Sequence, residues 1–130
     1  MPYYMLANEP GNSSVLIKKE FTPEPPKKNE VIIKNESIGI NFIDIYIRKG
    51  TYPWPIETNN KNLILGSEGA GIIDAIGSEV TNFKIGDRVG FLKTNGAYTS
   101  HRTIEQDFVV HLPGFISFDQ AEAVMLKGLT

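Results

Sequence analysis

The segment from residue 40 to residue 49 carries the densest group of polar side chains that could take part in chemistry. Asn41, Asp44 and Arg48 fall at helical spacing on one face, and a stripe of three isoleucines occupies another. Gly50 follows as a helix stop. Taken alone, this pattern favours an ordinary amphipathic helix, in which an Asp44–Arg48 ion pair would contribute only ~0.3–0.5 kcal/mol.

A glycine cluster at residues 66–71 is the second candidate for chemistry. It resembles a dinucleotide fingerprint, but that fingerprint needs a small residue at position 74 and a helix after the glycines. Position 74 is Asp74, and residues 72–77 have strand character. We therefore interpret the cluster as a strand whose glycines allow bends and close backbone approach.

Metal and nucleophile chemistry have little support in the sequence. His101 and His111 are too far apart to form a metal pair by spacing, and no Asp or Glu accompanies them in a ligand pattern. The chain has no cysteine, which excludes disulfides, thiolate nucleophiles and Cys-ligated metals. No G-x-S-x-G elbow for a serine hydrolase occurs. We expect no bound metal.

Size and charge limit the remaining classes of function. A chain of 130 residues predicts a single domain, and a net charge of −2 gives no electrostatic footprint for nucleic acid. No stretch approaches the ~20 apolar residues that cross a bilayer, and the first residues lack the pattern of a signal peptide. We expect a soluble, cytoplasmic protein without nucleic-acid or membrane partners.

Short strands separated by Gly/Pro turns dominate the pattern along the chain. Strands are predicted at 15–21, 30–40, 63–76, from 88, and at 106–112, with short helices at 40–49 and from 117. Asn95-Gly96 predicts a hairpin that leads into 97–100, and Ser117 with Gln120 forms a capping box. A mainly β (α+β) fold, either a small irregular barrel or a sandwich, follows.

Three blocks, 39–44 (GINFID), 65–71 (LGSEGAG) and 86–89 (GDRV), identify a family. In this order they resemble the N-terminal catalytic domain of medium-chain dehydrogenases/reductases, which implies a GroES-like irregular β-barrel. In the zinc alcohol dehydrogenases of that superfamily, the places of Asn41 and Ser67 hold a cysteine and a histidine that bind zinc. Carboxamide and hydroxyl groups are not competitive zinc ligands. The chain therefore resembles the zinc-independent branch, the NADPH:quinone oxidoreductases of the zeta-crystallin type.

The resemblance also implies roles for individual residues. In similar quinone reductases the 41–48 segment lies at the cleft between two domains, near the nicotinamide and the substrate. The implied cofactor contacts, with NADPH as the hydride donor, are Asn41, Phe42, Ile43, Asp44, Tyr46, Lys127 and Thr130. The implied catalytic residues are Asn41, Tyr46 and Tyr52 as hydrogen-bond or proton donors to a quinone, and Arg48 as a source of positive field. A quinone accepts hydride readily, so these donors would suffice without a Lewis acid.

The family pattern sets the expected domain organisation. Family members continue past the equivalent of 127–130 into a Rossmann nucleotide-binding domain, so we expect 1–126 to be the GroES-like catalytic domain and 127–130 the start of the crossing into a domain that is missing here. The isolated chain should be inactive, and a homodimer is expected through the surface of the 41–48 helix. The alternatives are another zinc-free member, such as an enoyl reductase, or a non-enzymatic orphan or remnant domain.

Overall fold

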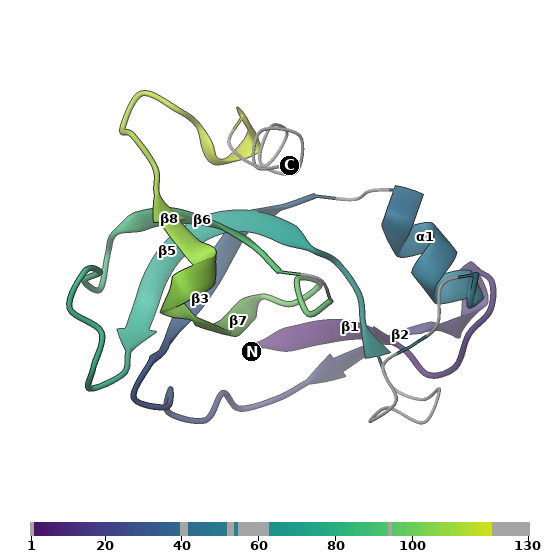
Figure 1. Cartoon of the computed structure of the whole chain (residues 1–130). Helices are drawn as coiled ribbons and strands as arrows, with labels where there is room; N and C mark the ends of the chain where they lie inside the picture. The colour runs from purple at the N-terminus through teal and green to yellow at the C-terminus, as the bar shows by residue number, and fades with distance from the viewer. Residues whose placement is uncertain (1, 40–41, 52–53, 55–62, 94, 121–130) are drawn as a thin grey trace.

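The computed structural model describes residues 2–39, 42–51, 54, 63–93 and 95–120. Its strands are β1 (Tyr3–Ala7), β2 (Leu16–Glu20), β3 (Glu30–Ile38), β4 (Leu63–Ile64), β5 (Glu68–Ile76), β6 (Arg88–Leu92), β7 (His101–Glu105) and β8 (Val109–His111). Among the described residues, the helical elements are α1 (Phe42–Lys49), two 3₁₀ turns, η1 (Ser13–Val15) and η3 (Gln106–Phe108), and helical residues at 118–120. This is the mainly β architecture with a few short helices that the sequence predicts (Figure 1).

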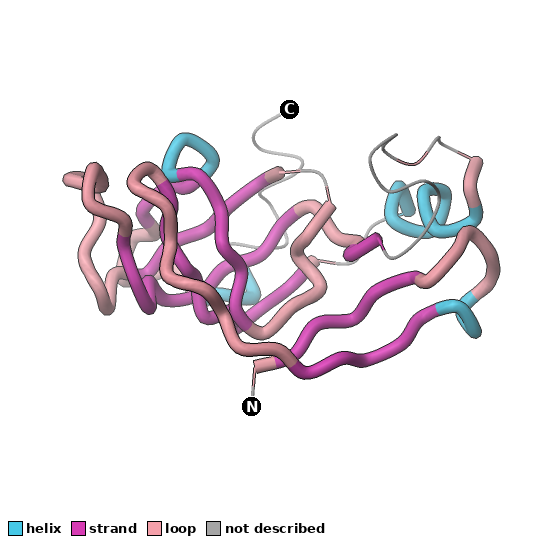
Figure 2. Tube along the Cα trace, turned by 90° about the horizontal axis from the view of Figure 1, so that it is seen from below, coloured by secondary structure: helices cyan, strands magenta, loops and turns pink. Residues whose placement is uncertain are grey.

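The strands form two antiparallel sheets. The larger has the order β7-β3-β5-β6-β8, and the smaller has the order β2-β1-β4. An isolated bridge between Tyr4 and Thr99 connects β1 to the segment that precedes β7. In both views α1 lies beside the connection between β1 and β2 (Figures 1 and 2). The helix is thus placed at one end of the smaller sheet, away from the body of the larger one.

Close approach of β3 and β5 depends on Gly71. A Cβ atom at Gly71 would lie 2.1 Å from the carbonyl oxygen of Lys34 and 2.9 Å from the Cα of Asn35. No side chain fits at those distances, so only glycine allows this pairing. The interpretation of the glycine cluster as a strand with close backbone approach, rather than as a dinucleotide fingerprint, is confirmed from Glu68 onward, where β5 begins.

Two apolar clusters support the two sheets. The first lies in the larger sheet and contains Val31, Ile33, Ile73, Val80, Phe83, Val89, Phe91, Ala97, Ile104 and Val109. The second lies against α1 and contains Ala7, Ile47, Trp54, Leu63 and Leu65. In β3, Val31 and Ile33 point into the first cluster.

The predicted C-terminal end of the first helix and the predicted N-terminal cap of the second are both seen in the structure. α1 stops at Gly50, whose φ is +83°, a backbone conformation that glycine adopts without strain. At the other predicted helix, Gln120 donates its backbone N–H to Ser117 Oγ at 3.1 Å and Ser117 donates to Gln120 Oε1 at 3.0 Å. Residues 121–126, predicted to continue this helix, are outside the described residues. Within the described chain no helix is long and apolar enough to span a membrane.

The prediction of a hairpin at Asn95-Gly96 is wrong, although both residues have the backbone conformation of a tight turn. Asn95 and Gly96 have φ values of 63° and 110°, as a tight turn of this type requires. However, β6 pairs with β5 and β8, and β7 pairs with β3, so the flanking strands do not pair with each other. The Gly96 N–H instead donates to the carbonyl of Ile64 at 2.8 Å. Local turn chemistry fixed the backbone conformation there but not the partners of the strands.

Other boundaries also differ from the prediction. The strand predicted at 63–76 is interrupted at Gly66, whose φ is +95° and over which the ring of Tyr98 packs. The first three residues of the strand predicted at 106–112 form η3. β1 was not identified as a strand, because its apolar residues do not alternate with polar ones. As the central strand of the smaller sheet, β1 pairs along both edges.

Candidate functional site

Helix α1 is anchored through its buried face. Asp44 and Ile47 are 2% and 5% exposed, and Ile47 belongs to the second apolar cluster. The indole N–H of Trp54 donates to the carbonyl of Ile47 at 2.5 Å. Apolar contact and one side-chain hydrogen bond together fix the position of the helix against the smaller sheet.

The buried carboxylate of Asp44 meets a tyrosine from a distant part of the chain. The hydroxyl of Tyr98 donates to Asp44 Oδ2 at 3.2 Å. Burial and then the charge of Asp44 raise the pKa of Tyr98 well above its ordinary value, while the charge of Arg48 acts in the opposite direction. Tyr98 therefore stays protonated at neutral pH and remains a donor to Asp44.

Tyr98 is the site residue that sequence analysis missed. It lies 54 positions from Asp44, and no periodicity connects residues so far apart. It also lines both the cleft beside α1 and a second cavity formed with Tyr3, Met5 and Ile38. Tyr98 is therefore part of the wall that supports α1.

Arg48 is tied to the connection between β1 and β2. Its Nε donates to the carbonyl of Gly11 at 3.3 Å, and its own carbonyl accepts the N–H of Gly11 at 2.8 Å. Within the described chain, Arg48 and Asp44 form no ion pair, so the pair suggested by their spacing is not seen. The half-buried guanidinium is instead bonded to the backbone carbonyl of Gly11.

Tyr46 lies on the outer face of α1 and is 46% exposed. It is therefore placed at the surface while Asp44, two residues earlier, is enclosed. Of the other predicted site residues, Phe42 and Ile43 belong to α1, but their side chains are outside what the structure describes. The remaining ones, Asn41, Tyr52, Lys127 and Thr130, are outside the described residues. The roles of all these residues stay predictions.

A small cleft opens beside α1. It has a volume of about 240 Å³ and is lined by Leu16, Asp44, Ile45, Arg48, Leu65 and Tyr98. Binding sites for whole cofactors usually enclose ~300–1,000 Å³. The cleft thus fits a single ring or headgroup of a ligand, with Arg48 as its cationic residue, and could form only one wall of a dinucleotide site.

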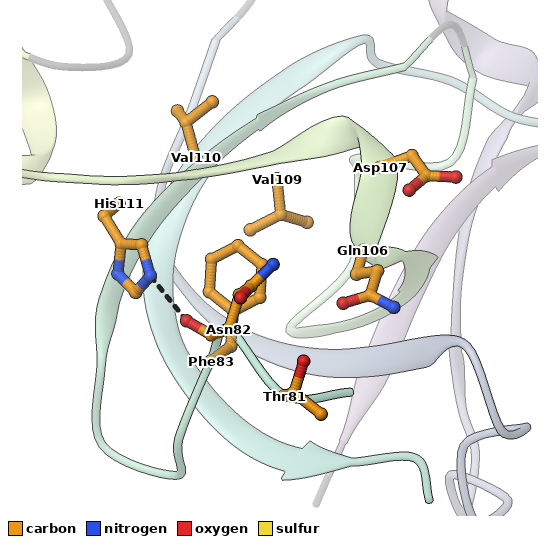
Figure 3. A pocket seen from close by; sticks show the side chains of 8 residues that line it. All are labelled: Thr81, Asn82, Phe83, Gln106, Asp107, Val109, Val110 and His111. Atoms are coloured by element: carbon orange, nitrogen blue, oxygen red, sulfur yellow. Dashed lines mark hydrogen bonds between the residues drawn. The ribbon is translucent and has the colours of Figure 1, made fainter. Parts of the chain in front are cut away.

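A larger cavity of about 640 Å³ lies between the 81–83 segment on one side and η3 and β8 on the other (Figure 3). Nε2 of His111 lies 2.7 Å from the carbonyl oxygen of Asn82, to which it donates when it carries the proton, and the His111 ring stacks on Phe83 with centroids 4.5 Å apart. The lining contains no residue predicted for the site. His111 is thus engaged in packing and a backbone contact in this cavity.

Ser67, which occupies the position of the zinc-binding histidine of the zinc alcohol dehydrogenases, is buried, and so is its neighbour Glu68. Ser67 and Glu68 are 4% and 2% exposed, and the Ser67 carbonyl accepts the N–H of Lys93 at 2.8 Å. Among the residues described, no three His, Asp or Glu side chains gather as a metal site. Asn41, the other ligand place, lies outside the described residues, so the metal-free site stays a prediction.

The block at 86–89 is structural. Gly86 has a φ of +97°, and Asp87 Oδ2 accepts the N–H of Lys84 at 2.9 Å to close the turn. Arg88 opens β6 and donates to the carbonyls of Pro113 and Ile116. The strand start at residue 88 is as predicted, and Arg88 ties it to the segment around Pro113 and Ile116.

With the fold and the α1 cleft in place, comparison with known families defines the class of this protein. Residues 27–115 match the family described as "Alcohol dehydrogenase GroES-like domain". The chain belongs to this family, as the three sequence blocks predict.

Within that class, the chain is homologous to quinone oxidoreductases. The quinone oxidoreductase of Pseudomonas aeruginosa is 48% identical over 121 residues, which are 92% of this chain and 36% of that protein. The structure of the Escherichia coli quinone oxidoreductase complexed with NADPH aligns with a TM-score of 0.89 at 44% identity, over 98% of this chain and 38% of that one.

A solved enoyl reductase is also similar in structure. CurK enoyl reductase aligns with a TM-score of 0.89 at 28% identity, over 98% of this chain and 40% of that one. The chain thus spans little more than a third of the length of each of these three proteins.

Proposed function

We propose that this chain is the N-terminal catalytic domain of a zinc-independent quinone oxidoreductase that transfers hydride from NADPH to a quinone. The main support is its 44% identity and TM-score of 0.89 to the Escherichia coli quinone oxidoreductase complexed with NADPH. That alignment extends over 98% of this chain, which supports use of the same cofactor.

Some residues in and near α1 would take part in the reaction, and others would hold the helix in position. NADPH, when bound, supplies the hydride. The exposed Tyr46, together with Asn41 and Tyr52, would donate hydrogen bonds or a proton to the quinone oxygen as it gains charge. Arg48 would add positive field from the wall of the cleft. Asp44 would contribute indirectly, because its contact with Tyr98 positions the helix that carries Tyr46.

The cleft beside α1 supports a site shared between two domains. Its volume of about 240 Å³ is too small for a whole dinucleotide. We infer that 1–126 form the catalytic domain and that 127–130 begin the crossing into a nucleotide-binding domain, with Lys127 and Thr130 near the cofactor. That second domain would hold the pyrophosphate and ribose. A cytoplasmic location and a homodimer through the α1 surface complete the proposal.

A chimera tests this function. Residues 1–126 would replace the matching part of the Pseudomonas aeruginosa quinone oxidoreductase, to which this chain is 48% identical. The expected result is oxidation of NADPH that depends on an added quinone. The reaction would be monitored as a loss of absorbance at the nicotinamide band of NADPH. A chimera that folds and binds NADPH but leaves it unoxidised with every quinone offered would refute the proposal.

Enoyl reduction is the second candidate. The TM-score of 0.89 to CurK enoyl reductase supports it, although the identity is 28% against 44% for the quinone oxidoreductase. The same chimera separates the two, because α,β-unsaturated thioesters can be offered in place of quinones. A higher kcat/KM with the thioester would favour an enoyl reductase. Inertness with both would favour a non-enzymatic domain.

A further inference from the structure

Arg102 occupies an unusual place for a charged residue. In β7 the exposed Thr103 separates Arg102 from Ile104, so these two share the face that points into the larger sheet's core. Arg102 is only 5% exposed, and Ile104 1%. An arginine at a core-facing position of a strand costs desolvation that an apolar residue of similar size would avoid. This cost indicates that the charge has a purpose beyond packing.

The guanidinium is only partly satisfied by the protein. Its Nη2 donates to the carbonyls of Asn95 at 2.7 Å and Lys93 at 3.2 Å, and its plane lies over the ring of Phe91, 4.8 Å from the centroid. Its Nη1 is buried without a hydrogen-bond partner among the described residues. A buried, charged donor left in this state carries a large desolvation penalty, which a bound acceptor would relieve.

No carboxylate neutralises Arg102 directly. Glu105 is the nearby acidic group that acts on its pKa, but the Glu105 carboxylate is bonded to Lys93 Nζ at 2.6 Å. Burial lowers the pKa of Arg102 to about 10, so the side chain is still a cation at neutral pH. A positive charge therefore remains inside the protein, and its direct contacts among the described residues are two carbonyl oxygens and an aromatic face.

A pocket of about 490 Å³ opens beside this charge, between β7 and the smaller sheet. Its lining combines basic, polar and apolar side chains and includes no Asp or Glu: Tyr4, Phe21, Ile64, Lys93, Asn95, Gly96, Thr99, His101, Arg102 and Thr103. The rings of Tyr4 and Phe21 pack on each other with centroids 5.2 Å apart. The pocket thus has a basic end and an apolar wall.

The guanidinium of Arg102 packs directly against Gly96. A Cβ atom at Gly96 would lie 3.1 Å from Nη2 of Arg102, so a side chain there would crowd the guanidinium. Glycine at this position lets the cation lie against the wall of the pocket that both residues line. The volume also exceeds what an inorganic anion fills and falls within the range of ~300–1,000 Å³ typical of small organic ligands.

We propose that this pocket binds a small organic carboxylate, whose oxygens accept from Arg102 and whose apolar body lies against Tyr4 and Phe21. Arginine and carboxylate match in geometry and form charge-assisted, often bidentate hydrogen bonds. Lys93, which is paired with Glu105, and His101 lie at the same end of the pocket. The site is separate from the α1 cleft, since the two share no lining residue.

Benzoate, a carboxylate on an aromatic ring, is the probe that tests this site. The ¹⁵N-labelled chain would be titrated with benzoate at constant ionic strength while the side-chain Nε–Hε signals of its arginines are followed. The chain has three arginines, Arg48, Arg88 and Arg102, so two serve as internal controls. A saturable shift confined to Arg102 is expected, with a much smaller effect from acetate and none from neutral benzamide.

Two variants complete the test. Arg102→Met should weaken benzoate binding at least tenfold in calorimetry, whereas Lys84→Met, which removes an exposed charge outside the pocket, should leave it unchanged. Equal binding by Arg102→Met, or benzoate shifts that are absent or equal at all three arginines, would overturn the proposal. So would a preference for phosphate over benzoate, because the apolar wall would then have no role. If Arg102→Met does not fold, the titration of the unaltered chain decides alone.

Discussion

The hydroxyl of Tyr98 donates to Oδ2 of Asp44 across 3.2 Å, which connects the middle of α1 to the segment that precedes β7. Asp44 is 2% exposed, so this contact is shielded from competing water. The orientation of α1, and with it the position of the exposed Tyr46, therefore depends on a residue outside the helix. Substitution of Tyr98 should therefore change the support of α1.

Loss of the Tyr98 hydroxyl should destabilise the protein. Tyr98→Phe removes one hydrogen-bond donor from a buried carboxylate, and a hydrogen bond to a charged group contributes about 1.5–3 kcal/mol. Urea unfolding should show a lower free energy of unfolding of this size. Tyr3→Phe, at a tyrosine 39% exposed on β1, is the matched control and should change the free energy by less than about 0.5 kcal/mol. Equal values for the two variants would mean that the Tyr98–Asp44 bond contributes nothing.

The same contact predicts a loss of stability at alkaline pH. The pKa of Tyr98 is raised in the folded chain by burial and then by Asp44, so above the ordinary tyrosine value of about 10 the folded state binds more protons than the unfolded state. Its contribution is fully present below that pH and is lost as the pH rises further. Unfolding free energies measured upward from pH 9 should fall more steeply for the unaltered chain than for Tyr98→Phe. Parallel curves would contradict the assignment.

The glycines of β5 offer a sharper test of the fold. Gly71→Ala would place a methyl group 2.1 Å from the carbonyl oxygen of Lys34, so β3 and β5 must separate, at a cost of roughly 3 kcal/mol or more. Gly114→Ala is the control, because nothing lies within 4 Å of a Cβ atom there. Thermal unfolding should show a large drop in midpoint for the first variant only. A midpoint for Gly71→Ala close to that of the unaltered chain would show that the two strands are not held this closely.

Much of the architecture could be predicted because local chemistry determines it. The stop at Gly50, the Ser117–Gln120 capping box and the left-handed turn at Asn95-Gly96 each depend on neighbouring residues only. The family and its fold followed from three blocks in order. Strand partners were less accessible: the turn at Asn95-Gly96 fixed a backbone conformation but did not decide that β6 pairs with β5 and β8.

Features of the site that depend on distant contacts could not be predicted. Tyr98 meets Asp44 from 54 positions away, and helical spacing suggested Arg48 as the partner of Asp44 in its place. Arg102 alternates with the exposed Thr103 and so lies on the same face of β7 as the buried Ile104. The same alternation would be found if Arg102 were a solvated charge on an edge strand, so the sequence could not show that it is buried. Only the three-dimensional arrangement shows which of these charges are enclosed.

The isolated chain should not reduce quinones. Hydride transfer requires the nicotinamide and the quinone to be held at near-attack distance, and the cleft beside α1, about 240 Å³ in volume, provides one wall only. Incubation of the chain with NADPH and a soluble quinone should leave the NADPH absorbance unchanged over the uncatalysed rate. Consumption of NADPH that scales with the amount of chain would contradict this expectation.

The most direct test of the central claim is the kcat/KM for quinone reduction by the chimera with and without Tyr46→Phe. Removal of one hydrogen-bond donor from a site of developing negative charge commonly lowers the rate by about 100-fold or more, and we predict a loss of at least tenfold for this easily reduced substrate. The free energy of unfolding should stay within about 0.5 kcal/mol, because the side chain is exposed. Tyr3→Phe should change neither quantity. Unaltered kcat/KM in Tyr46→Phe would remove the outer face of α1 from the mechanism.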